Sequence, residues 1–99
     1  MFIDHNKYQQ DGLTQNMMHI DFQKVFEAAG WNVRVVDGHN VEVLYESIKK
    51  ETHNDGKPVV YVCNTVKGKG VSFMEGDNSW HHASMNDEQY NQAINELKD

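Results

Sequence analysis

The sequence has little that could cross-link the chain or anchor it in a membrane. A single cysteine among 99 residues excludes an internal disulfide. No apolar run approaches the ~20 residues that a membrane-spanning helix needs. The first residues, Met1 to Asp4, lack the basic segment and long apolar stretch of a secretory signal. These absences predict a cytoplasmic protein without a membrane segment.

Basic side chains are also scarce. There are 9 Lys and Arg against 15 Asp and Glu, which gives a net charge of −6. Surfaces that bind nucleic acid are positively charged, so no nucleic-acid partner is predicted. The length allows one small domain, residues 1–99. A chain of this size buries only about two-thirds of its unfolded surface, which leaves room for a partner surface.

Hydrophobic patterning predicts helices that alternate with strands. Three segments carry apolar residues at helical spacing: Phe22, Val25, Phe26 and Ala29 within residues 19–30; Val41, Leu44, Tyr45 and Ile48; and Tyr90, Ala93, Ile94 and Leu97. Strands are predicted at residues 2–3, 31–36 and 59–63. Expected helix and turn boundaries are Gly30 as a C-terminal residue, Asn40 as an N-cap, a turn at Asn54-Asp55-Gly56, and Asn86 with Gln89 as a capping box.

This order of elements predicts an α/β fold, with a partial parallel sheet of about three strands and flanking helices. The uninterrupted apolar run 59–63 is typical of a strand covered on both faces, and it favours a buried, inert thiol for Cys63. Loops 4–12, 37–39 and 64–70 follow the predicted strands. Open parallel sheets bind ligands at this edge, so the three loops are expected to converge there. The connection 64–85 is long, as functional or mobile loops are.

The first loop reads Asp4-His5-Asn6-Lys7-Tyr8-Gln9-Gln10-Asp11-Gly12. Mg²⁺ prefers hard oxygen ligands beside phosphate oxygens and water. In an extended segment, the side-chain carbonyl of Asn6 and the main-chain carbonyl of Tyr8 can point the same way and offer two neutral oxygens. Taken from the residues alone, Asn6 more often satisfies nearby backbone groups, and Asp11-Gly12 is simply a turn.

The second group is Lys67-Gly68-Lys69-Gly70 with Trp80-His81-His82. Glycines let a backbone approach a ligand closely, and a lysine between them can meet a phosphate. A histidine exchanges protons near neutral pH. Without further context this segment is more often a flexible turn, and it lacks the spacing of a Walker motif. Trp31 and Trp80 are interpreted as packing residues. The six histidines, His53 among them, show no close ligand spacing for zinc.

Together the two motifs resemble the thiamine-diphosphate-binding half of transketolases, in the order and at roughly the separation found in the split-type enzymes. The resemblance implies that Asn6 and Tyr8 are ligands of Mg²⁺ or Ca²⁺. It implies that Lys67 and His81 bind the cofactor near its reactive end and act in catalysis. It gives Asp37-Gly38-His39 a mainly structural role. His82 stands where many members have glycine, so its role is left open.

The resemblance implies transfer of a two-carbon ketol unit between sugar phosphates, dependent on thiamine diphosphate and magnesium, as in the pentose phosphate pathway. A pyrimidine-binding domain or subunit is the expected partner, within an oligomer. The Gly-Asp-Gly motif that supplies a further metal ligand would precede Asn6 by a few dozen residues. The expected match is therefore the later half of one domain, active only with other chains. The alternative is a truncated or degenerate remnant, acting as a non-catalytic binding or assembly module.

Overall fold

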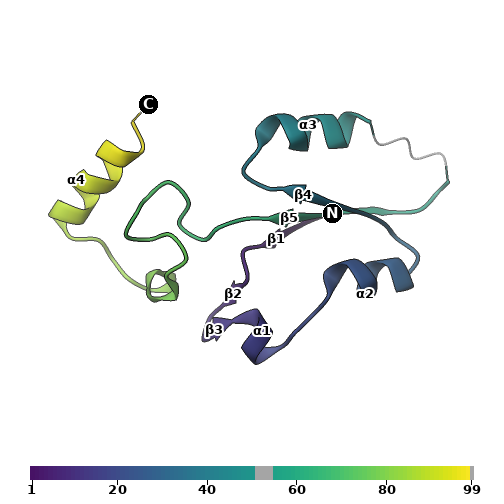
Figure 1. Cartoon of the computed structure of the whole chain (residues 1–99), viewed down its shortest axis with the longest axis horizontal. Coiled ribbons are helices and arrows are strands. Elements are labelled where there is room, and N and C mark those ends of the chain that lie inside the picture. The colour runs from purple at the N-terminus through teal and green to yellow at the C-terminus, as the bar shows by residue number, and fades with distance from the viewer. Residues whose placement is uncertain (51–54, 99) are drawn as a thin grey trace.

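The protein is described by a computed structural model, which covers residues 1–50 and 55–98. A three-stranded parallel sheet has the order β1 (Phe2–His5), β5 (Val59–Asn64), β4 (Asn32–Asp37). Helices α2 (Phe22–Ala28) and α3 (Val41–Lys49) lie on opposite sides of it (Figure 1). The predicted α/β class and parallel sheet are confirmed.

The core lies along β5, whose side chains from Val59 to Cys63 are all buried. Val59, Tyr61 and Cys63 form one cluster with Val36 of β4, and Leu44 of α3 packs against it. Alternate side chains of a strand face opposite sides, so the two remaining valines of β5 face α2. The prediction of a strand covered on both faces is confirmed. Burial raises the pKa of the Cys63 thiol, as expected of an inert cysteine.

Helix boundaries follow the local signals in the sequence. The Asn40 side chain accepts a hydrogen bond from the Val43 amide at 3.0 Å. Asn86 and Gln89 form the capping box that starts α4 (Asp87–Glu96). Gly30 takes φ +82° just after α2, a conformation that favours glycine. Of the predicted turn at 54–56, Asn54 lies outside the described residues.

One local prediction is wrong. Asp4 and His5 belong to β1 and not to the loop, because both pair with β5. The apolar stripes of the helices are only partly buried: Val25 is 53% exposed and Tyr45 is 60% exposed. A sheet of three strands is narrow, so a helix lying on it can cover only some of its apolar residues.

Short elements occupy the segments that follow β1 and β5. Residues after β1 form a hairpin of β2 (Tyr8–Gln9) and β3 (Gly12–Leu13), followed directly by α1 (Thr14–Met17). The long connection after β5 contains a 3₁₀ helix, η1 (Asn78–His81). Both segments leave the same edge of the sheet, which is where the candidate site lies.

The molecule is flat and has two lobes (Figure 1). Its extents are 52 × 34 × 14 Å, and its radius of gyration is 16.6 Å; a compact domain of this length has about 13 Å. One lobe is the sheet with α2 and α3. In the other, α4 packs on the loop after β5, where Val71 and Ala93 are buried. Within the described residues, no helix is long and apolar enough to cross a membrane.

Candidate functional site

The loops that leave the sheet meet at its carboxyl edge, as predicted. The Gly38 amide donates to the Asn64 carbonyl at 2.9 Å, and the Thr65 hydroxyl donates to the Asp4 carboxylate. A Cβ on Gly38 would lie 2.5 Å from the methyl group of Thr65. The close approach of the two loops therefore requires glycine at position 38.

His39 holds the residue that precedes Lys67. Its Nε2 accepts a hydrogen bond from the Val66 amide at 2.7 Å, and its own amide donates to Asp37 Oδ1 at 2.9 Å. An imidazole nitrogen accepts only when it carries no proton, so the neutral ring makes this contact. The geometry supports the structural role expected of Asp37-Gly38-His39.

The Asn6 side chain satisfies a nearby backbone group, which is the role that the residues taken alone predicted. Asn6 Oδ1 accepts a hydrogen bond from the Tyr8 amide at 2.9 Å. The Thr14 amide donates to the Lys7 carbonyl at 2.9 Å, in a bond that flanks the paired residues Tyr8 and Leu13. Tyr8 and Leu13 are then a non-hydrogen-bonded pair, so the amide and carbonyl of Tyr8 both point outward. The Tyr8 carbonyl and the Asn6 side chain therefore lie along the same edge of the hairpin.

These two oxygens fit part of a site for a hard cation. After accepting one hydrogen bond, Asn6 Oδ1 keeps a second lone pair. Both oxygens are neutral ligands, which suits a cation whose charge is balanced by a diphosphate. Residues 1–50 and 55–98 contain no group of three or more His, Cys, Asp or Glu side chains that could hold a metal ion. Asn6 and Tyr8 could thus supply two ligands, with phosphate and other oxygens completing the set.

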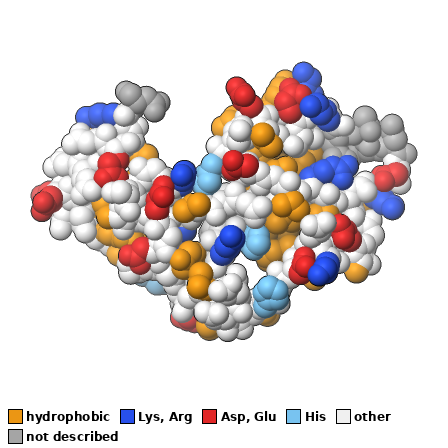
Figure 2. Space-filling model, in the orientation of Figure 1, with side chains coloured by type: hydrophobic (Ala, Val, Ile, Leu, Met, Phe, Trp, Pro, Cys, Tyr) orange, Lys and Arg blue, Asp and Glu red, His pale blue; other side chains and the backbone are white. Residues whose placement is uncertain are grey.

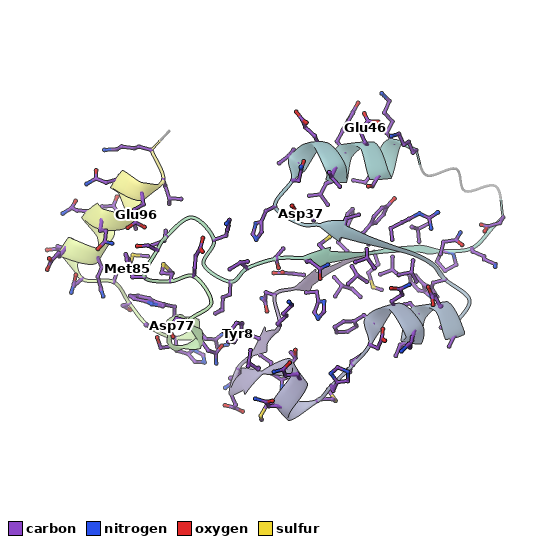
Figure 3. The ribbon with its side chains drawn as sticks, in the orientation of Figure 1. Tyr8, Asp37, Glu46, Asp77, Met85 and Glu96 are labelled. Atoms are coloured by element: carbon purple, nitrogen blue, oxygen red, sulfur yellow. The ribbon has the colours of Figure 1, made fainter. Side chains whose placement is uncertain are left out.

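Tyr8 also connects the first motif to the second. Its hydroxyl donates a hydrogen bond to the Gly76 carbonyl, and the Gly76 amide donates to the Lys67 carbonyl at 2.9 Å. The Asn78 side-chain amide donates to the Gln10 carbonyl at 3.2 Å. Figure 3 shows Tyr8 beside the loop that it contacts. The hairpin and the glycine-rich loop therefore form one connected unit.

The two lysines of the glycine-rich loop differ in their partners. Lys69 Nζ lies 3.6 Å from Glu75 Oε1, which also accepts from the Gly70 amide at 3.0 Å. That amide, then the Lys69 charge, lowers the pKa of the Glu75 carboxyl. Lys67 has no carboxylate within ion-pair distance in the described part of the chain. Lysine and histidine side chains gather where the two lobes meet (Figure 2). Lys67 is thus the lysine whose charge is available to a phosphate.

His81 is the candidate residue that stands apart. It ends η1 and is exposed, with its ring 4.5 Å from that of His82. The preceding Trp80 packs on Phe73, whose carbonyl accepts from the indole N–H at 3.0 Å, which bears out the packing role predicted for Trp80. Trp31 packs in the same way, edge-on to an aromatic ring of α2. No hydrogen bond or ring contact within the described residues joins His81 to the other candidate residues.

The sequence analysis missed Gly76 and Asn78. The Gly76 carbonyl accepts a hydrogen bond from the Tyr8 hydroxyl. The Asn78 side-chain amide donates a hydrogen bond to the hairpin, while Asn78 Oδ1 is buried without a hydrogen-bond partner. The available signal was the turn chemistry of Gly76-Asp77-Asn78 shortly before Trp80. Sequence alone could mark this turn, but it could not show which distant residue the turn contacts.

Residues 1–98 match the family described as "Transketolase, thiamine diphosphate binding domain". The chain belongs to this transketolase family. Its relatives include the 6-deoxy-6-sulfo-D-fructose transketolase subunit of Clostridium sp. (strain MSTE9), which is 36% identical over 98 residues. An apulose-4-phosphate transketolase subunit of Phocaeicola vulgatus is 34% identical over 98 residues. In each case the match covers 98% of this chain, but only 36% and 35% of the relative, so the chain spans about a third of their length.

The fold is that of one part of a solved transketolase. The crystal structure of transketolase from Campylobacter jejuni superposes with a TM-score of 0.83 at 23% identity. The superposition covers 95% of this chain and 15% of that one. At this identity the likeness establishes the fold, while the family match establishes the thiamine-diphosphate-binding domain.

Proposed function

We propose that this chain forms the metal-holding and diphosphate-holding part of a transketolase-type enzyme. The enzyme transfers a two-carbon ketol unit between sugar phosphates and depends on thiamine diphosphate and Mg²⁺ or Ca²⁺. The observation that carries the proposal is the contact of Asn6 Oδ1 with the Tyr8 amide, together with the link from the Tyr8 hydroxyl through Gly76 to Lys67. The family match supports the same cofactor.

When bound, thiamine diphosphate supplies the reactive carbon that takes up and releases the ketol unit. The chain's own residues bind and position. Asn6 and Tyr8 offer oxygens to the cation, and the ammonium group of Lys67 meets a phosphate oxygen. His81 is assigned the exchange of a proton with a substrate hydroxyl, because an imidazole can act as both acid and base near neutral pH. The exposure of His81 leaves its ring accessible to an incoming substrate.

We further propose that a pyrimidine-binding domain or subunit completes the site. Two relatives are described as transketolase subunits, which supports a partner chain. Many apolar side chains are exposed, including Phe2 at 56% and Val41 at 77%. A surface of this kind favours association. The proposed assembly is a cytoplasmic oligomer acting in the pentose phosphate pathway.

Calorimetric titration tests the proposal. Thiamine diphosphate with Mg²⁺ is added to the purified chain alone, and then to the chain mixed with a split-type pyrimidine-binding subunit. Heat of binding in the mixture only would support a site completed at the interface, and a ketol-transfer assay would follow. No binding in either case would contradict the proposal and favour the alternative, a non-catalytic binding or assembly module.

A further inference from the structure

A cleft of ≈ 370 Å³ lies on the α2 side of the sheet, beside the first motif, from which His5 and Lys7 line it. Its described lining includes none of Asn6, Tyr8, Lys67 or His81. Pockets that hold small ligands have volumes of about 300–1,000 Å³. The cleft is therefore large enough for a small organic molecule.

The floor of the cleft is apolar. Val62 of β5 and Val35 of β4 line it from the sheet, and Phe22 lines it from α2. Val35 is 51% exposed although it sits within a strand of the sheet. Figure 2 shows apolar and histidine side chains side by side on this lobe. A ligand with an apolar or ring-shaped body would cover surface that the protein itself leaves open.

The rim of the cleft carries basic groups. Lys7, His5 and His19 line it, and Asp21 is the one carboxylate among its described lining residues. Asp21 is already engaged, because its Oδ1 accepts from the Lys24 amide at 3.1 Å and its Oδ2 lies 3.1 Å from Lys24 Nζ. Lys7 has no carboxylate within ion-pair distance in the described chain. In a chain of net charge −6, this rim is suited to an anion.

The main chain holds Lys7 in an unusual conformation. It is the only non-glycine residue with positive φ, at 68°, in the described chain. Its carbonyl accepts from the Thr14 amide at 2.9 Å and from the Thr14 hydroxyl at 3.2 Å. A lysine in this region costs on the order of 1–3 kcal/mol, and such strain gathers at functional sites. The hairpin thus fixes the backbone that presents Lys7 to the cleft.

We infer that this cleft is a second binding site, which takes a small organic phosphate with an apolar or ring-shaped body. Lys7 pairs with the phosphate, and His5 and His19 are placed to donate hydrogen bonds to it. The body of the ligand packs on Val35, Val62 and Phe22. The inference does not depend on the proposed catalytic function, because the lining excludes the motif side chains that carry that function.

The test is NMR titration of the full chain with three probes: phenyl phosphate, phenol and inorganic phosphate. Phenyl phosphate is expected to shift the amide signals of Ile20, Phe22 and Val35, and to bind about tenfold more tightly than either fragment, a difference of about 1.4 kcal/mol. The Lys7→Gln variant should bind phenyl phosphate about tenfold more weakly. Lys7→Arg keeps the charge and should retain binding, and the exposed Lys57→Gln serves as control.

Several outcomes would overturn the inference. They are equal binding of phenol and phenyl phosphate, an unchanged affinity in Lys7→Gln, shifts confined to residues outside the cleft, and no shift with any probe. Displacement of phenyl phosphate by thiamine diphosphate with Mg²⁺ would also overturn it, because the cleft would then belong to the cofactor site. Failure of the proposed function leaves these signals unchanged, so the two results are distinguishable.

Discussion

The Tyr8 hydroxyl donates a hydrogen bond to the Gly76 carbonyl, which lies 68 residues later in the chain. The Gly76 amide in turn donates a hydrogen bond to the Lys67 carbonyl. This contact links the segment of the proposed metal ligands to the segment of the proposed phosphate-binding lysine. It makes the two motifs one structural unit and not two independent loops.

Tyr8→Phe should loosen that unit. Loss of the hydroxyl leaves the Gly76 carbonyl without this donor, so the free energy of unfolding should fall by about 1 kcal/mol. Hydrogen exchange at the amides of residues 68–76 should become faster. Urea unfolding and exchange mass spectrometry measure the two effects. Tyr90→Phe is the matched control, because Tyr90 is 58% exposed on α4. Equal effects of the two changes would refute the link.

Gly68→Ala should be more damaging than Gly30→Ala. Both glycines have positive φ, at 73° and 82°, so alanine costs about 1–2 kcal/mol at either site. At position 68 the added Cβ would also lie 2.5 Å from the Met74 carbonyl oxygen, whereas nothing lies within 4 Å at position 30. Thermal or urea unfolding of both variants measures the difference. Equal destabilisation would show that the loop opens without cost.

Lys67→Gln and Lys69→Gln should differ in cofactor affinity. Lys69 is paired with Glu75, whereas the Lys67 charge is available. Lys67→Gln should weaken binding of thiamine diphosphate with Mg²⁺ by about tenfold, as loss of one charged contact does. Lys69→Gln should weaken it less. Calorimetry in the presence of the partner subunit compares the affinities of the two variants for the cofactor. A larger loss of affinity in Lys69→Gln would assign the phosphate to Lys69.

Glu96 should make the docking of α4 sensitive to acid. Its carboxylate accepts from the Gln92 side chain at 2.7 Å, the Ser72 amide at 2.6 Å and the Ser72 hydroxyl at 2.7 Å. These bonds, the Gln92 contact first, lower the pKa of Glu96 below its usual 4.5. Because the pKa of Glu96 is lower in the folded chain than in the unfolded chain, the ionised carboxylate adds stability at pH values above its unfolded pKa. This stability is lost as the pH falls through the pKa of the folded chain.

The measurement is hydrogen exchange of the Ser72 amide between pH 7 and pH 3. Protection should fall in the acid range for the natural chain. The Glu96→Gln variant keeps an acceptor but has no charge, so its protection should change less with pH. The same acid dependence in both proteins would remove Glu96 from this role.

Features that depend on residues close together in the sequence were predicted correctly. The caps at Asn40 and Asn86 and the end of α2 at Gly30 are local, because each involves groups within a few residues. The buried strand 59–63 was also predictable, since its apolar run is continuous. The convergence of three loops followed from the parallel order of the strands.

Contacts between distant segments could not be predicted in the same way. Nothing near Tyr8 in the sequence indicates that its hydroxyl reaches Gly76, or that Asn78 reaches Gln10. Helical spacing groups Tyr45 with the apolar residues of its helix, yet Tyr45 is exposed, because burial also depends on the width of the sheet. The exposure of His81 likewise depends on how η1 ends, which its motif does not show.

The central claim is that Asn6 and Tyr8 hold the cation of the cofactor. Its most direct test is titration of thiamine diphosphate with Mg²⁺ into Asn6→Ala, mixed with the pyrimidine-binding subunit, beside Asn95→Ala as an exposed control on α4. We expect Asn6→Ala to lose Mg²⁺-dependent binding with little loss of folding, and Asn95→Ala to bind as the natural chain does. Unchanged affinity in Asn6→Ala would remove Asn6 from the metal site and contradict the account.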